Sequence, residues 1–287
     1  MDESIEARLD EIFKEWYDEI HKKEGDDKKF TKDGIMFNEN IPVNEIEDIW
    51  KKSSRRVLFL LKDQYQHEEK KWPEDIRDWL RVTDFDRNKD RNNGNNKAVT
   101  QKEKNKELQS KILRKLAYLL WGLSKVNKDT VDDWPEGNVN KAFKDGRLKE
   151  FFNTQPFALV ECKKTPGDSS LKDSILQGNL RDYGKFLKDE IKTLNPNIIV
   201  CSGNRIFEFV AKYYSEIKDT NEPQTYGGKY ELGDGTTVRN LTTCLKYYPG
   251  SKTVVINSYH PSAPVGWKYF EKVMSPFRAF IREHSEF

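Results

Sequence analysis

His260 lies shortly after an apolar run that has the pattern of a buried strand. The run is VVI (254–256) within VVINSYHPSAP, three residues separate it from the histidine, and Pro261 and Ser262 come immediately after His260. The proline restricts the backbone of His260 to extended conformations and so fixes the direction of the imidazole. An imidazole can serve as a general acid or base, or donate a hydrogen bond to a developing oxyanion. Ser262 adds a hydroxyl that can bind a phosphate, so we expect both residues in one site.

Asp63 follows a second apolar run, VLFLL at 57–61. Five apolar residues without alternation are typical of a central parallel strand that is buried on both faces. A carboxylate at the end of such a strand can orient or deprotonate a water molecule, or stabilise a developing cation. The alternative is a structural role, in which Asp63 caps a helix or pairs with Lys62.

Two further candidate strands lead into residues that are suited to anion binding. PFALVEC (156–162) opens onto KKTPGDSS, and its residues 165–170 are predicted to form a turn whose N–H groups and hydroxyls can bind phosphate. NIIVC (197–201) is followed by Ser-Gly-Asn (202–204) at the start of a predicted helix, which is a general anion-binding arrangement. The sequence therefore predicts four strand ends with polar residues.

Helices are predicted between and around these strands. Apolar residues recur with helical spacing over about 3–22, 43–52, 108–120, 180–194, 206–213 and 270–281. This alternation favours an α/β fold, a three-layer α/β/α sandwich around a mainly parallel four-stranded sheet. Ligands of such sheets bind outside the carboxyl ends of the strands, so Asp63 and His260 are expected at one edge.

The whole chain, 1–287, is expected to form a single domain. Residues 1–52 supply N-terminal helices, and the charged stretch 68–150 is predicted to be a long insertion of helices and loops between the first two core strands. A hairpin is predicted in KYELGDGTTVRNL, with its turn at 233–235.

Composition restricts the class of protein. The 50 basic residues nearly cancel the 48 acidic ones, so any nucleic-acid footprint must come from local clustering of Lys and Arg. Cys162, Cys201 and Cys244 are far apart, which excludes a disulfide framework and a CxxC metal site. We expect no metal and no cofactor. No apolar run approaches the roughly 20 residues that span a bilayer. The acidic N-terminus lacks the features of a signal peptide, so a cytoplasmic protein without a membrane partner is expected.

Together the four strand ends resemble the uracil-DNA glycosylase superfamily over about half the chain. VLFLLKDQYQH is similar to the first motif of that family, a strand that delivers a water-activating Asp followed by an aromatic residue. Asp63 and Tyr65 match these places, and Gln64 replaces the usual proline. VECKKTPG and NPNIIVCSGNRIFEFV resemble the second and third strand segments of the bacterial branch, and SYHPSAP matches the last motif, His-Pro-Ser.

The resemblance implies a DNA N-glycosylase that flips a pyrimidine nucleotide out of double- or single-stranded DNA, excises the base and leaves an abasic site. Asp63 would position water and stabilise the sugar cation, and His260 would hydrogen-bond the pyrimidine O2. The base pocket would be lined by Tyr65, Gln64, Ala158 and Asn204. DNA would be contacted by Lys163, Lys164, Thr165, Ser169 and Ser262, with Val265 or Trp267 as the wedge that fills the vacated stack.

Two departures from the family bear on the target base. Ala158, counted back from Cys162, stands where the bacterial branch has an Asn that reads uracil, which leaves room for a modified pyrimidine. Tyr65 acts in the other direction, because a Tyr at that place is the family's block against 5-substituents. The iron–sulfur cluster of the bacterial branch needs four cysteines, so this chain is expected to lack it. Repair, or defence against phages with modified DNA, is the expected biology of a monomeric enzyme.

Two alternatives stay open. The absent Asn and the substituted Gln64 also suit a non-catalytic module that binds nucleic acid or a nucleotide on a glycosylase-like fold. An unrelated α/β enzyme with its ligand at 202–204 ranks last, because the spaced glycines of a dinucleotide fingerprint are absent there.

Overall fold

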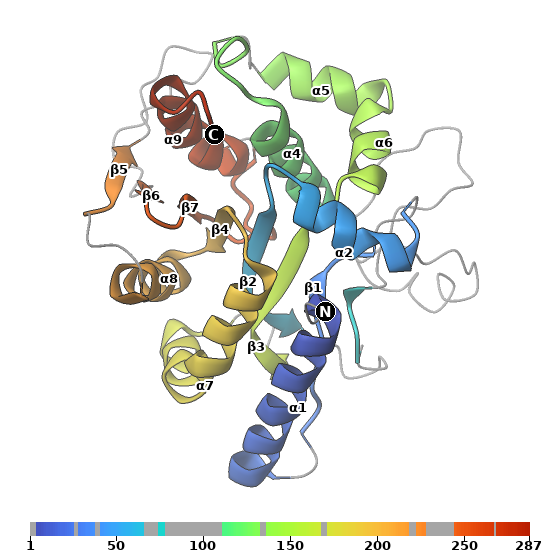
Figure 1. Cartoon of the computed structure of the whole chain (residues 1–287), viewed down its shortest axis with the longest axis vertical. Helices are drawn as coiled ribbons and strands as arrows, with labels where there is room; N and C mark the ends of the chain where they lie inside the picture. Colours follow the sequence, from blue (N-terminus) through green and yellow to red (C-terminus); the bar gives the residue numbers. More distant parts are fainter. Residues whose placement is uncertain are drawn as a thin grey trace.

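A computed structural model of the chain gives one mixed α/β architecture around a single sheet (Figure 1). The structure describes residues 4–25, 28–37, 41–65, 74–77, 111–132, 136–167, 171–217, 222–227, 244–266 and 268–287. Within these ranges the sheet has seven strands in the order β1-β3-β2-β4-β7-β6-β5. The strands are β1 (Gly34–Ile35), β2 (Val57–Tyr65), β3 (Ala158–Gly167), β4 (Ile198–Ser202), β5 (Gln224–Gly227), β6 (Cys244–Tyr248) and β7 (Thr253–Ser258).

The centre of the sheet consists of the four strands that the sequence predicts. β3, β2, β4 and β7 are neighbours and parallel. The prediction of a four-stranded sheet was nevertheless wrong, because β1 adds an antiparallel strand beside β3, and β6 and β5 extend the other edge. β1 has only two residues, and Tyr226 is the one buried residue of β5, so neither has the apolar run that predicts a strand. The hairpin turn predicted at 233–235 lies outside the described residues.

Helices cover both faces of the sheet, so the layers are helix, sheet and helix (Figure 1). The helices are α1 (Ile5–Glu24), α2 (Val43–Lys52), α4 (Lys111–Lys125), α5 (Glu136–Lys144), α6 (Arg147–Thr154), α7 (Asp173–Leu194), α8 (Asn204–Ile217) and α9 (Lys268–Glu283). Side chains of a strand alternate between faces. Phe59 and Leu61 therefore face α4, α6 and α9, which we call the α4–α9 face, and Leu58 and Leu60 face α1, α7 and α8, the α1–α7 face.

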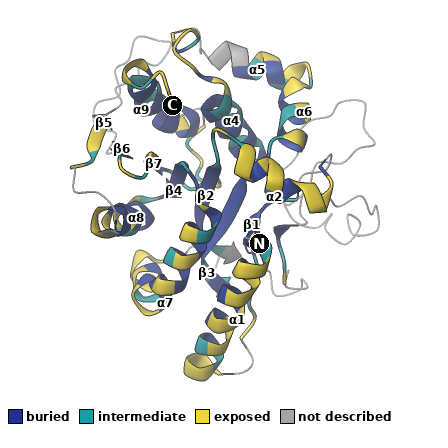
Figure 2. Cartoon of the chain, in the orientation of Figure 1, coloured by how far each residue is buried: buried dark blue, intermediate teal, exposed yellow. Residues whose placement is uncertain are grey.

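The central strands are buried on both faces, whereas the helices expose their outer sides (Figure 2). This explains the uninterrupted apolar runs of the strands and the helical spacing of apolar residues elsewhere. The predicted stop of the helix before Pro196 is confirmed, since Asn195 adopts the left-handed conformation, with φ 46°, directly after α7. None of the described helices is long and apolar enough to cross a membrane.

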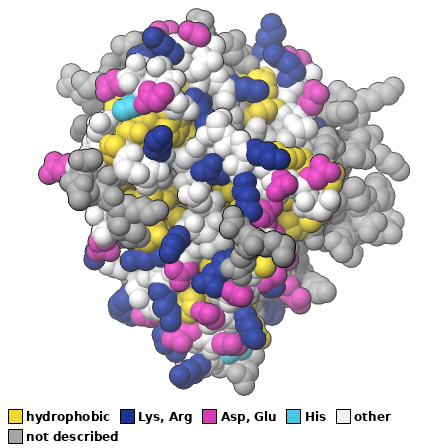
Figure 3. Space-filling model, viewed as in Figure 1, with side chains coloured by type: hydrophobic (Ala, Val, Ile, Leu, Met, Phe, Trp, Pro, Cys, Tyr) yellow, Lys and Arg dark blue, Asp and Glu magenta, His cyan; other side chains and the backbone are white. Residues whose placement is uncertain are grey.

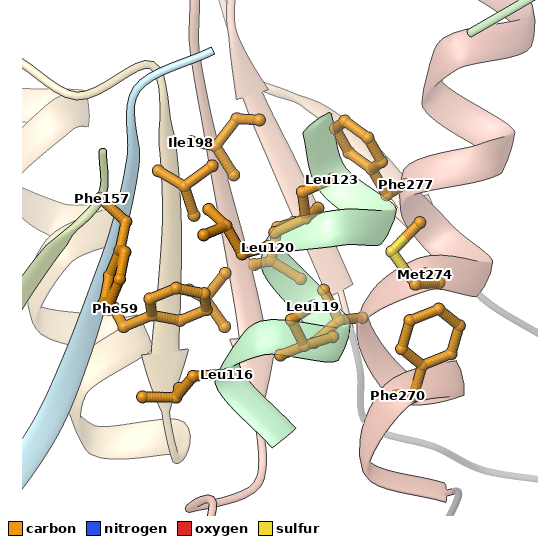
Figure 4. Packing of buried hydrophobic residues seen from close by; sticks show 14 of the residues in the cluster. Phe59, Leu116, Leu119, Leu120, Leu123, Phe157, Ile198, Phe270, Met274 and Phe277 are labelled. Atoms are coloured by element: carbon orange, nitrogen blue, oxygen red, sulfur yellow. The ribbon is translucent and has the colours of Figure 1, made fainter. Parts of the chain in front are cut away.

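α4 is a core helix, although it belongs to the segment 68–150 that the sequence predicts to be an insertion. Its leucines lie between the sheet and α9, with Leu120 toward Phe59 and Ile198 (Figure 4). At Gly122 a Cβ atom would lie 2.7 Å from Sδ of Met274, so glycine permits the close approach of α4 and α9. The described part of the insertion therefore completes the main domain.

Candidate active site

The carboxyl ends of the four parallel strands meet at one edge of the sheet. Asp63 in β2 pairs with Lys163 in β3, and Ser202 of β4 pairs with Ser258 of β7. His260 follows the end of β7 by two residues. β4 lies between β2 and β7, so the strands that carry Asp63 and His260 are about 9.6 Å apart, two strand spacings. The two side chains therefore lie at the same edge, on strands that flank β4.

A close approach of two strands fixes the position of the Asp63 carboxylate. β2 continues beyond Asp63, which therefore lies within the strand and not past its end as the sequence suggests. Its carboxylate packs against Gly167 of β3, where an added Cβ atom would lie 1.3 Å from Asp63 Oδ2. Only glycine leaves this space to the carboxylate. Asp63 is half-buried and continues the alternation of Phe59 and Leu61, so it points toward the α4–α9 face.

The imidazole of His260 is held in one orientation by Ser262. Nδ1 of His260 lies 2.7 Å from the Ser262 hydroxyl and accepts a hydrogen bond of 3.2 Å from the backbone N–H of Ser262. Because a backbone N–H can only donate, Nδ1 carries no proton, and the neutral ring has its proton on Nε2. Burial, with the positive charges of Lys62 and Lys115, lowers the pKa of His260 to about 4. The ring is therefore a neutral Nε2–H donor at physiological pH.

Lysines from three elements surround the His-Pro-Ser loop. Lys62 of β2 forms an ion pair of 3.1 Å with Asp173, and Lys115 of α4 donates a hydrogen bond of 2.6 Å to the carbonyl of Ala263. Lys272 of α9 is buried, and its Nζ lies 4.0 Å from the centre of the Tyr259 ring. Burial lowers the pKa of Lys272. Sequence reasoning missed Lys62 as a site residue, and also Lys115 and Lys272, because both lie within helical apolar patterns.

Ala158, which is predicted to line the base pocket, lies instead in the core at the amino end of β3. Ala158 is the first residue of β3, has 0% exposure and pairs with Leu58 on the α1–α7 face. β3 runs on for nine residues beyond it, and Lys163 is the residue in register with Asp63. Counting back from Cys162 therefore selected a core position at the amino end of the strand.

Asn204 begins α8, and its Oδ1 accepts a hydrogen bond of 2.6 Å from Nδ2 of Asn257. Asn257 continues the alternation of Val255, so this amide pair lies on the α1–α7 face, opposite the side to which Asp63 points. The structure thus places Asn204 at the strand edge but with its amide toward α8. Gln64 and Tyr65 belong to β2, and their side chains lie outside the described part of the molecule.

Two of the predicted DNA contacts are corrected. Lys164 has 0% side-chain exposure on the α1–α7 face, where it pairs with Asp33 and, at 2.9 Å, with Glu190. Thr165 is also buried, because residues 165–167 continue β3 where a surface turn was predicted. One position along the strand separates Lys164 from Lys163, and that step moves a side chain to the other face of the sheet.

The remaining predicted DNA contacts are placed as follows. Lys163 is half-buried and donates to the backbone carbonyls of Thr165, at 2.9 Å, and Pro166. Ser262 is exposed beside His260. Val265 packs partly buried against the core of the α4–α9 face. Ser169 and Trp267 lie outside the described residues.

Two surface hollows occur elsewhere on the described molecule. One is lined by Gln224, Tyr226, Glu283 and His284, and the other by Ser4, Arg8, Asp189 and Lys192. Neither contains Asp63 or His260. Within the ranges that the structure describes, no three His, Cys, Asp or Glu side chains are grouped so that they could hold a metal ion.

The state of His260 gives a first prediction. The imidazole titrates near 6.5 when unfolded and near 4 when folded, so the unfolded chain binds more protons between these pH values. Acidification through this window should therefore lower the stability of the fold. Nitrogen NMR of the imidazoles, with His260→Gln to assign the signal, should show an Nε2–H tautomer that stays neutral at pH 5. Lys62→Met should raise the pKa of His260. A His260 signal that titrates at 6.5 or above would contradict this assignment.

No protein-family model matches the sequence, and no curated protein matches it.

Proposed function

We propose that the chain is a DNA N-glycosylase that excises a pyrimidine base, uracil or a modified pyrimidine, with Asp63 and His260 as its catalytic residues. One observation carries this proposal: a sterically fixed carboxylate and a neutral Nε2–H imidazole share one sheet edge, with basic side chains around the imidazole. This arrangement suits a reaction in which positive charge develops on a sugar and negative charge on a leaving base.

Asp63 acts on the sugar. When the bond between C1′ and the base nitrogen breaks, its electron pair leaves with the base, and the sugar acquires oxocarbenium character. A carboxylate held in place stabilises that cation without reorganising. It also orients the water whose oxygen adds to C1′ and accepts the proton that the water gives up.

His260 acts on the leaving base. Its Nε2–H donates a hydrogen bond to the pyrimidine O2, where negative charge accumulates as the bond breaks. A neutral imidazole keeps its proton and stabilises the anion as a fixed donor. The ammonium groups of Lys62 and Lys115, which lower the pKa of His260, add positive potential at the same place.

DNA binding is expected to rely on this local cluster of lysines. The face of the molecule in Figure 3 carries basic and acidic side chains intermingled, without one continuous basic area. Lys62, Lys115, Lys163 and the Ser262 hydroxyl would bind the phosphates on either side of the flipped nucleotide. Since Ala158 lies in the core, its small size does not bear on the target base.

The proposal is tested with short duplex and single-stranded DNAs that contain one uracil, thymine, cytosine or 5-substituted pyrimidine. The protein should release the base from at least one of them, and alkali should then cleave the strand at the abasic site. Asp63→Asn and His260→Gln should each slow the reaction. Asp129→Asn is the control and should not slow it, because Asp129 is an exposed carboxylate distant in sequence from both residues. DNA retention without any abasic product would indicate instead a non-catalytic nucleic-acid-binding module.

A further inference from the structure

Glu161 is a buried carboxyl group near Asp63. The proposed base excision assigns no role to Glu161. It lies in β3 with 3% exposure and pairs with Leu61, two residues before Asp63 in β2. Glu161 and Asp63 occupy alternate positions of their strands on the same side, so both point to the α4–α9 face. The two carboxyl groups are electrostatically coupled, since the negative charge of Asp63 is among the causes that raise the pKa of Glu161.

No ionic partner in the described residues explains this burial. The nearby cation, Lys164, lies on the opposite face and already pairs with Asp33 and Glu190. Asp33 contacts Glu161 only through the backbone, where its Oδ2 accepts the Glu161 N–H at 2.7 Å. Oε2 of Glu161 is buried without a hydrogen-bond partner among the described residues. A buried polar atom without a partner is destabilising, so the fold gains nothing from it.

The side chain is held as a neutral acid. Burial, and then the negative charges of Asp33 and Asp63, raise the pKa of Glu161 well above its usual range. A carboxylic acid has one O–H donor and one carbonyl acceptor side by side. It can also exchange them without moving, because the proton can reside on either oxygen, whereas an amide must rotate by about 180° to exchange its donor and acceptor.

We propose that Glu161 is the hydrogen-bonding group at the inner end of the Asp63–His260 site and that it holds the N3–C4 edge of the flipped pyrimidine. This inference rests on the proposed function. Two residues separate the level of Glu161 from that of Asp63, roughly 6.6 Å along the strand, comparable with the breadth of a pyrimidine ring. With the sugar at Asp63, the far edge of the base then reaches Glu161.

The chemistry of the acid defines the class of base. Uracil and thymine present an N3–H donor beside an O4 acceptor, and cytosine presents an N3 acceptor beside an N4–H donor. Neutral Glu161 is complementary to both edges, with its proton on one oxygen or the other. The site should accept pyrimidines with a free N3–C4 edge and reject those with a methyl group on N3.

Two substitutions test this role in the full-length protein. Glu161→Leu removes both hydrogen bonds and should slow base release roughly 10- to 100-fold. Leucine leaves no unpaired polar atom, so the denaturant midpoint should stay equal or rise. Glu161→Gln can exchange its donor and acceptor only by rotating the amide, which the packing around this buried position hinders. It should therefore narrow the range of bases released, with the uracil-type or the cytosine-type edge disfavoured. Glu15→Leu, at an exposed position of α1, is the matched control and should change neither the rate of base release nor the range of bases released.

The outcomes separate this inference from the proposed function. Base release by Glu161→Leu and Glu161→Gln with wild-type rates and an unchanged range of bases would overturn the inference alone. If the wild-type protein releases no base, the glycosylase proposal fails, and saturation-transfer NMR with free bases then decides the role of Glu161. Uracil or cytosine should bind the wild-type protein but not Glu161→Leu, and N3-methyluracil should bind neither. Equal binding of these bases to both proteins would overturn it.

Discussion

An alanine at Gly167 is expected to abolish base release almost as completely as substitution of Asp63 itself. The added Cβ atom would lie 1.3 Å from Asp63 Oδ2, so the carboxylate must move away from its position against β3. Displacement of a catalytic group by about 1 Å costs on the order of 10²-fold in rate, and loss of a charge-stabilising group costs roughly 10²–10³-fold. Gly167→Ala should therefore lower the single-turnover rate by roughly 10²–10³-fold, although it removes no functional group.

Gly178→Ala is the matched control for this substitution. Gly178 lies within α7, and nothing lies within 4 Å of its added Cβ atom. Alanine there should leave the rate unchanged and stabilise the helix by about 0.5–1 kcal/mol. DNA binding by Gly167→Ala should persist, because the lysines around His260 are untouched. A variant with the wild-type rate would show that the Asp63 carboxylate does not act from this position.

The second large effect is on stability. Lys164 lies between the carboxyl groups of Asp33 and Glu190. The side chains of all three residues have 0% exposure. Burial, and then the negative charge of Asp33, raise the pKa of Glu190 well above its usual range, whereas Lys164 is stabilised as a cation. Lys164→Met leaves the two acids facing each other without a cation. The free energy of unfolding should fall by about 3–5 kcal/mol.

Urea unfolding measures this loss as a lower midpoint at unchanged slope. Adding Glu190→Gln to Lys164→Met should recover part of the stability, because one of the two opposed acids is then removed. Lys192→Met is the control. Lys192 lies on the exposed side of α7, the helix that carries Glu190, so this substitution should change the free energy of unfolding by less than about 0.5 kcal/mol. A Lys164→Met protein with wild-type stability but weaker, salt-dependent DNA binding would instead restore the sequence-based assignment of Lys164 to DNA contact.

The central strands and their shared edge could be predicted from sequence because their apolar runs are uninterrupted. Val57–Leu61 and Val254–Ile256 are buried on both faces, and this burial produces the pattern that locates Asp63 and His260. The edge strands could not be predicted, since β1 is too short and β5 buries only Tyr226.

The rest of the site depends on strand register, which a single sequence does not specify. Lys163 and Lys164 are adjacent and of one type, yet they lie on opposite faces, and only the pairing of β3 with β2 shows which one accompanies Asp63. The position of Glu161 beside Asp63 could not be predicted for the same reason, since the sequence shows only one acid within an apolar strand. Ala158 was counted from a motif, and the true length of β3 puts it at the other end of the sheet.

The most direct test is mass spectrometry of the bases released from phage, host and uracil-containing DNA by the wild-type protein and by Asp63→Asn. The wild-type protein should release one kind of free pyrimidine and leave one abasic site for each base released. Asp63→Asn should bind the same DNA and release roughly 10²–10³-fold less base in the same time. Absence of any released base with the wild-type protein, or equal release by the two proteins, would contradict base excision at the Asp63–His260 edge.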